Sequence, residues 1–147
     1  MKKLVVLLGP TGVGKTELSL NLAEYWKSPI ISADSRQLYR GLEIGTAAPT
    51  SAQLKRAKHY MVGILEVENY YSASEFETDC LRLIDNIPNN HIILSGGSMM
   101  YIDAICNGID EIPTIDEELR REVYKQYEEK GLDAIKAQLK ILDPEFY

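Results

Sequence analysis

The chain has 147 residues, of which 45% are hydrophobic and 26% are charged, and its formal net charge is −6. These values are typical of one globular domain with a substantial core. No stretch approaches the roughly 20 apolar residues that a membrane span requires, and the apolar run before Gly9 is too short for a signal peptide. We therefore expect a cytoplasmic protein without a membrane segment. Cys80 and Cys106 lack metal-ligand spacing, which favours core packing or a chance free thiol for each of them.

The first predicted strand covers residues 4–8 and leads into a glycine-rich loop. This loop matches the phosphate-binding pattern G-x-x-x-x-G-K-[ST] and consists of Gly9, Pro10, Thr11, Gly12, Val13, Gly14, Lys15 and Thr16. Its glycines let backbone N–H groups face an anion, and the helix predicted from Lys15 to about Trp26 directs its positive end to the same place. Lys15 adds a cation and Thr16 a hydroxyl for Mg²⁺. The pattern predicts a phosphate site; a strand-to-helix turn without a ligand is the alternative.

A second short strand is predicted over residues 29–32 and is followed by the sequence Asp34-Ser35-Arg36-Gln37. Asp34 has three interpretations: the N-cap of a helix, a Mg²⁺ ligand through water, or a general base. Beside a phosphate site, Arg36 is suited to hold a phosphate and Gln37 to read a base edge. This neighbourhood favours the catalytic interpretations of Asp34.

Basic residues gather in the next part of the chain, where Glu43 is the single acid between residues 36 and 58. The cations of this basic segment are Arg36, Arg40, Lys55, Arg56 and Lys58. Residues 107–147, by contrast, carry more acids than cations. A cationic segment in an acidic chain is a candidate for binding phosphate, although a solvated loop has the same composition.

The remaining strands and helices alternate. Residues 60–67 form a third, weaker predicted strand, and a capping box of Ser72 and Glu75 begins a helix. A buried strand over residues 91–94 then leads through two glycines into a helix over residues 98–106. This order predicts an α/β fold, with a P-loop NTPase-like parallel sheet flanked by helices.

The last part of the chain carries two amphipathic helices without a strand between them. Thr114 and Glu117 form a second possible capping box, and Gly131 is a candidate C-cap between the helices. We therefore expect an α/β core over residues 1–112 and a helical hairpin over residues 113–147, as the start of a helical subdomain.

Ligands of open parallel sheets bind at the carboxyl ends of the strands, so the segments that follow the strands are expected to converge. Three segments meet this test: the phosphate loop, residues 34–37, and the sequence Gly96-Gly97-Ser98. Ser98 has two interpretations, as a helix cap or as part of a ligand site at a helix N-terminus.

Four runs of the sequence resemble the N-terminal half of the tRNA dimethylallyltransferase family, also called tRNA isopentenyltransferases: GPTGVGKTELSLNLA, ISADSRQLYRGLEIGTAAP, YYSASEFE and LSGGSMMY. The resemblance implies transfer of a dimethylallyl group from dimethylallyl diphosphate to the exocyclic N6 amine of the adenine just 3′ of the anticodon in tRNA. It implies that the loop holds a diphosphate leaving group, with Mg²⁺ at Thr16 and Lys15 assisting catalysis.

The resemblance also implies roles for the other site residues. Asp34 matches the general base of the family, and Ser98 matches a hydroxyl residue that assists at the same site. The tRNA-contacting positions that it implies are Asp34, Ser35, Arg36, Gln37, Ser98 and Arg120. We expect tRNA and dimethylallyl diphosphate as partners, no membrane, and a monomer.

The family's second half, with a Gln-Arg-x-x-Arg segment, has no counterpart before Tyr147. We therefore expect a truncated chain with feeble catalysis of its own. Three alternatives stay open: a small-molecule kinase that binds ATP at the loop, a nucleotide-sensing module without chemistry, and an isopentenyltransferase acting on free AMP or ATP.

Overall fold

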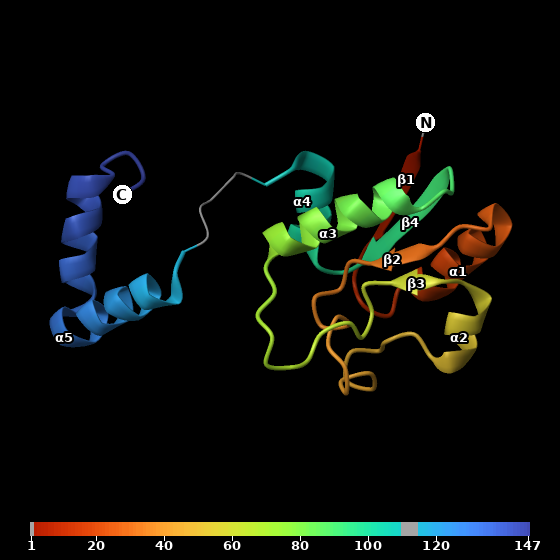
Figure 1. Cartoon of the computed structure of the whole chain (residues 1–147), viewed down its shortest axis with the longest axis horizontal. Coiled ribbons are helices and arrows are strands. Elements are labelled where there is room, and N and C mark those ends of the chain that lie inside the picture. Colours follow the sequence, from red (N-terminus) through yellow and green to blue (C-terminus); the bar gives the residue numbers. More distant parts are fainter. Residues whose placement is uncertain (1, 110–114) are drawn as a thin grey trace. The chain divides into compact units, whose positions relative to one another are not determined.

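A computed structural model of the chain describes residues 2–109 and 115–147. The chain divides into two compact units, Met1–Ile109 and Asp110–Tyr147. The first unit is the α/β part and the second is helical (Figure 1). The expected domain boundary after residue 112 falls within residues 110–114, outside the described residues.

The first unit is built on a four-stranded sheet in the order β1-β4-β2-β3, and all three strand pairs are parallel. Its strands are β1 (Lys3–Leu8), β2 (Ile30–Ser32), β3 (His59–Tyr60) and β4 (His91–Gly96). In the register, Leu94 of β4 faces Val6 on one side and Ile31 on the other. The predicted parallel sheet is confirmed.

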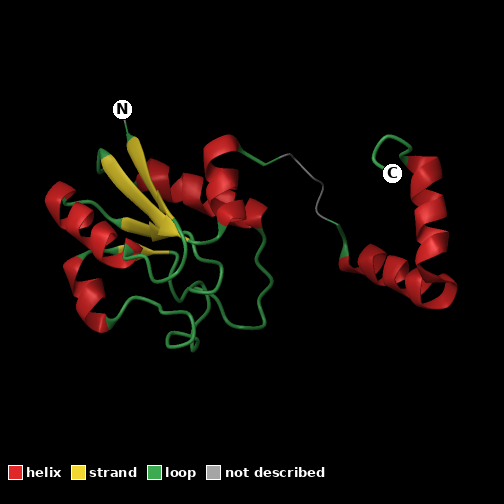
Figure 2. Cartoon of the chain, turned by 180° about the vertical axis from the view of Figure 1, so that it is seen from behind, coloured by secondary structure: helices red, strands yellow, loops and turns green. Residues whose placement is uncertain are grey.

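Helices cover both faces of this sheet (Figure 2). The covering helices are α1 (Lys15–Trp26), α3 (Ala73–Asn86) and α4 (Met99–Asn107), while α2 (Ser51–Arg56) contacts α1. Successive side chains of a strand point to opposite faces, so Ile92 and Leu94 pack on one core and Ile93 packs on the other. The continuous apolar run of β4 follows from this burial on both sides.

The larger core lies between the sheet and helices α3 and α4. Phe76 of α3 and Tyr101 of α4 stack with ring centroids 4.2 Å apart, and both pack against the strand residues of this face. On the opposite face, Leu20 and Ala23 of α1 pack against Ile30. Helix α1 is thus fixed to the sheet directly behind the phosphate loop.

Local capping explains where two of these helices begin. The Ser72 side chain accepts a hydrogen bond from the Glu75 N–H, and the Glu75 side chain accepts one from the Ser72 N–H, which confirms the predicted capping box of α3. Helix α2 was not predicted. It starts with an equivalent box of Thr50 and Gln53, whose spacing carries the same signal.

The third strand is much shorter than predicted. β3 pairs with β2 through His59 and Tyr60, and of these only Tyr60 lies within the expected span of residues 60–67. Met61 and Gly63 have φ of 59°, so the backbone leaves the extended conformation that a strand requires. Leu65 forms an isolated bridge with Tyr39.

The second unit consists of α5 (Glu117–Leu142), which is interrupted at Gly131. Gly131 has φ 76° and ψ 173°, a conformation that favours glycine, and the helix bends there (Figure 1). Asp116 caps the first turn by accepting from the Glu118 N–H at 2.9 Å. Thr114 of the predicted second capping box lies outside the described residues. No helix in the described ranges is long and apolar enough to span a membrane.

Candidate functional site

Three segments of the first unit meet at one edge of the sheet. The phosphate loop follows β1, Asp34 follows β2 and Ser98 follows β4, and β4 lies between the other two strands. Because parallel strands end at the same edge, the structure brings these three segments together, as predicted.

The phosphate loop, residues 9–16, owes its shape to its glycines. Gly9, Gly12 and Gly14 have φ of 153°, 84° and 93°, which side chains other than hydrogen rarely tolerate. Gly14 is also the N-cap of α1 and provides no side-chain oxygen to the first turn. The first N–H groups of α1 are therefore free of a side-chain cap, and they suit an anion.

Lys15 lies across this loop. Its Nζ donates hydrogen bonds to the carbonyl oxygens of Gly9 and Pro10, both at 2.7 Å. Its positive charge is therefore held over the loop, beside the positive end of α1. Thr16 follows in the first helical turn and is exposed, while its carbonyl accepts a hydrogen bond from Ser19 Oγ at 2.8 Å. The Lys15 ammonium group, the N-terminus of α1 and the Thr16 hydroxyl therefore all lie at the phosphate loop.

Asp34 starts a turn, not a helix. Its Oδ1 accepts from the Arg36 N–H at 3.0 Å, and its carbonyl accepts from the Gln37 N–H at 3.1 Å. Asp34 is therefore not the N-cap of a helix, but it caps a short turn over residues 34–37. We call this segment the Asp34 turn. The carboxylate is half-buried and keeps Oδ2 for other partners.

Ser98 ties the Asp34 turn to β4. Its Oγ accepts from the Ser35 N–H at 2.8 Å and donates to Ser35 Oγ at 3.1 Å. Its own N–H donates to the Ala33 carbonyl at 3.0 Å. Ser98 occupies the N-cap position of α4 without a side-chain cap bond, so its hydroxyl links two segments and does not cap the helix.

Of the other predicted contact residues, Arg36 is exposed on the Asp34 turn. Gln37 is half-buried, and its amide is bonded within the chain to Ser32, Thr46 and Ala47. Arg120 belongs to α5 in the second unit.

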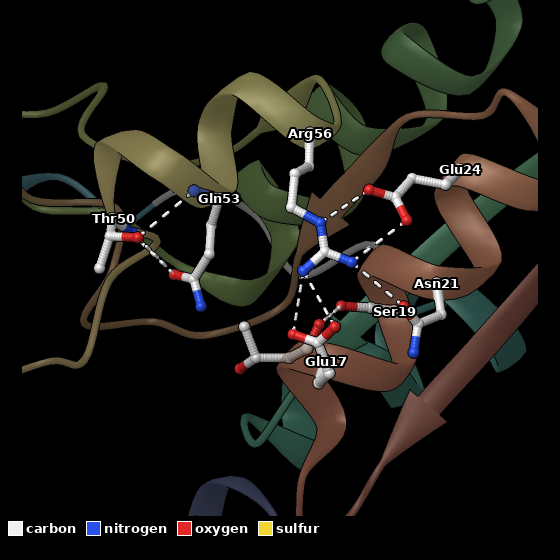
Figure 3. Close-up of polar contacts among 8 residues, drawn as sticks. Glu17, Ser19, Asn21, Glu24, Thr50, Gln53 and Arg56 are labelled. Atoms are coloured by element: carbon white, nitrogen blue, oxygen red, sulfur yellow. Dashed lines mark hydrogen bonds and ion pairs between the residues drawn. The ribbon is translucent and has the colours of Figure 1, made fainter.

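The cations of the basic segment differ in their surroundings. Arg56 donates to both carboxylate oxygens of Glu17, to Asn21 and to both oxygens of Glu24, all on α1 (Figure 3). The carboxylates of Glu24 and Glu17 raise the pKa of Arg56, and the hydrogen bond from Arg56 lowers the pKa of Glu24. Arg56 therefore attaches α2 to the helix of the phosphate loop. Sequence reasoning missed this role, although Glu17, Asn21 and Glu24 share one helical face.

Other members of this segment also bond locally. Arg40 forms an ion pair with Glu66, and Lys58 lies over the Tyr60 ring at 4.6 Å from its centroid. Nearby, a ring nitrogen of His59 bonds to the Ala57 carbonyl, and burial lowers the pKa of this imidazole, which disfavours its charged form. The segment as a whole is thus less available to a polyanion than its composition predicts.

Metal ligation by protein side chains alone is not supported in residues 2–109 and 115–147, where no group of three or more His, Cys, Asp or Glu residues could hold an ion. A hydroxyl at the start of a helix fits Mg²⁺ that takes most of its other ligands from phosphate and water. Thr16 is such a hydroxyl.

These features define a class: an α/β protein with a parallel sheet and a phosphate-binding loop between its first strand and helix. A sequence model described as IPP transferase matches residues 37–147. The chain belongs to this IPP transferase family. It is 58% identical to tRNA dimethylallyltransferase 1 of Phocaeicola vulgatus over 98% of this chain and 49% of that protein. It is 42% identical to tRNA dimethylallyltransferase of Flavobacterium johnsoniae over 100% of this chain and 48% of that protein.

Solved structures agree with this assignment. The full-length tRNA isopentenylpyrophosphate transferase of Bacillus halodurans is similar with a TM-score of 0.73 and 32% identity, over 99% of this chain and 49% of that one. A eukaryotic dimethylallyltransferase acting on tRNA gives a TM-score of 0.83 and 28% identity, over 99% of this chain and 37% of that one. The chain spans about half the length of the curated relatives it matches.

Proposed function

We propose that this chain provides the donor-binding and amine-activating part of a tRNA dimethylallyltransferase. The reaction transfers a dimethylallyl group from its diphosphate to the N6 amine of the adenine 3′ of the anticodon. The observation that carries the proposal is that the phosphate loop and the Asp34 turn follow β1 and β2 at the same end of the parallel sheet, with Ser98, which follows the strand between them, bonded to Ser35. The names of the relatives support the choice of reaction.

On the donor side, the phosphate loop would hold the diphosphate. Departure of an allylic diphosphate develops negative charge on its oxygens, and a cation beside a helix N-terminus stabilises such charge. Lys15, which already lies over the loop, suits this role. Bound Mg²⁺, held by Thr16 and by phosphate oxygens, would supply further positive charge to the leaving group.

On the acceptor side, Asp34 would act on the adenine amine. An aryl amine is a weak nucleophile, so a carboxylate that orients it and accepts its proton favours bond formation with the allylic carbon. Oδ1 of Asp34 is used by the Arg36 N–H, which leaves Oδ2 as the base. Arg36 and Arg120 are proposed contacts to tRNA phosphates. A monomeric state and a cytoplasmic location stay predictions from the sequence.

Calorimetric titration with dimethylallyl diphosphate and with ATP, each with Mg²⁺, tests the donor half of the proposal. We expect the native chain to prefer the allylic diphosphate and Lys15→Ala to bind it at least about tenfold more weakly, since a charge-assisted contact is lost. Lys125→Ala, which removes an exposed lysine of the second unit, is the charge-matched control and is expected to bind like the native chain. A preference for ATP would reject the proposal in favour of a phosphoryl-transfer enzyme.

Product formation on an anticodon stem-loop tests the acceptor half. Asp34→Asn is expected to retain donor binding and to lose most of the product formed by the native chain. Equal and measurable product from both chains would remove Asp34 from the role of base.

A further inference from the structure

The side chain of Gln37 connects the sheet to a loop over residues 42–48. Its Oε1 accepts from Ser32 Oγ at 2.9 Å, at the carboxyl end of β2. Its Nε2 lies 3.2 Å from the Thr46 carbonyl oxygen and 3.3 Å from that of Ala47. Carbonyl oxygens only accept, so the amide orientation is fixed by its partners.

The backbone of Gln37 makes two further connections. Its N–H donates to the Asp34 carbonyl and closes the Asp34 turn, while its carbonyl accepts from the Gly63 N–H at 2.8 Å. Residue 37 thus joins β2, the Asp34 turn, the 42–48 loop and the bend that follows β3.

The hydrogen bonds of Gln37 stabilise two of these partners, Ser32 and Ala47. Ser32 is only 4% exposed, and a buried hydroxyl without a partner is costly. Ala47 has φ 49°, a left-handed conformation that is strained for alanine and persists only when the surroundings hold it. The hydrogen bond from Gln37 to the Ala47 carbonyl is one such restraint, next to that from the Ala47 N–H to the Ile44 carbonyl.

We infer that Gln37 is a positioning residue that holds the 42–48 loop beside the Asp34 turn, and that it does not read the acceptor base. Both the carbonyl oxygen and the NH₂ group of the side-chain amide are already engaged, so a base edge would have to compete with these internal partners. The inference deepens the proposed function and rests on it for the importance of Asp34. The internal connections themselves are independent of that function.

Hydrogen exchange of the 42–48 amides tests the positioning role. Gln37→Glu keeps an acceptor for Ser32 and replaces the amide donor with a carboxylate oxygen that faces two carbonyls. Gln37→Met removes the donor without adding charge. For both variants we expect exchange of the 42–48 amides to rise at least about tenfold, because lost hydrogen bonds favour local opening.

Gln53→Glu is the matched control. Gln53 serves a capping box through Oε1, and glutamate serves such a box equally well, so exchange over residues 42–48 is expected to stay within about twofold of the native chain. Native-like exchange in both Gln37 variants would overturn the inference.

Binding of anticodon stem-loops that carry adenine or unsubstituted purine at the target position separates positioning from base reading. Gln37→Glu is expected to weaken both complexes by the same factor, which leaves the adenine-to-purine ratio within about twofold of native. A ratio altered fivefold or more would show base reading and overturn the inference. Absence of RNA binding by the native chain would count against the proposed tRNA substrate, while hydrogen exchange would still decide the role of Gln37.

Discussion

A Cβ atom placed on Gly96 would lie 2.1 Å from the carbonyl oxygen of Ala33. The backbones of β4 and of the chain after β2 therefore touch at the point where the Asp34 turn begins. Contact this close accounts for a glycine at position 96 and brings Ser98 within reach of Ser35.

Replacement of Gly96 by alanine is expected to destabilise the first unit, because the obstacle is backbone that cannot rotate away. A loss of about 1–3 kcal/mol is in the range of overpacked sites, and urea unfolding measures it. Gly97→Ala is the neighbouring control, since a Cβ there meets nothing within 4 Å. Equal stability of the two variants would contradict the close approach.

Ser98→Ala is expected to cost about 0.5–1.5 kcal/mol, the usual net contribution of a hydrogen bond, because the Ser35 N–H loses its acceptor. Ser98→Thr keeps the hydroxyl and is expected to stay within about 0.5 kcal/mol of native. Chemical denaturation of both variants provides the measurement. If alanine and threonine are equally tolerated, the Ser98–Ser35 link does not stabilise the fold.

The Arg56–Glu24 pair predicts a pH-dependent contribution to stability. Arg56 holds the pKa of Glu24 below its ordinary value of 4.5, so folding favours the ionised carboxylate. The contribution is therefore present above pH 4.5 and is lost as the pH falls through the folded-state pKa. We expect Glu24→Gln to be less stable than native at pH 7 in low salt, and the difference to shrink by pH 3.

High salt serves as the control for this prediction, because it screens exposed ion pairs at pH 7 and should also narrow the difference. A difference between native and Glu24→Gln that is the same at both pH values would rule out the ion pair as its cause.

The two thiols are expected to react at very different rates. Cys80 is fully buried, and burial raises the pKa of its thiol to about 12, whereas Cys106 is exposed. Ellman's reagent at pH 8 should therefore label one thiol of the folded chain quickly, and the Cys106→Ser variant should react only on unfolding. Rapid labelling of that variant would place Cys80 outside the core.

Much of the first unit follows from local sequence patterns. Both cores draw on the apolar run at residues 92–94, and its flanking turns bound β4 clearly. The Ser72 capping box predicts the start of α3 because its two partners are only three residues apart in the sequence. The prediction of a third strand over residues 60–67 failed because the positive φ at Met61 and Gly63 depends on tertiary contacts. One of these is the hydrogen bond from the Gly63 N–H to the Gln37 carbonyl.

The site was predictable as a set of segments but not as a set of contacts. Strand order and chain direction are enough to bring Asp34 and Ser98 to the same edge of the sheet. The partners of Arg56 and Gln37 lie far along the chain or across loops, and composition alone cannot distinguish a cation paired with its own protein from one that faces RNA. Their roles in substrate contact stay predictions.

The edge position of β1 has a consequence for the order in which the molecule folds. Among the strands that the structure describes, β1 pairs with β4 alone, so the backbone of β1 at Val6 gains its sheet hydrogen bonds only when Leu94 of β4 is in place. Contacts this distant in sequence form slowly because a long loop has to close first. During synthesis, the apolar strand β1 therefore stays without its β4 partner until β4 has emerged, and the phosphate loop that follows β1 becomes organised late although it is made before β4.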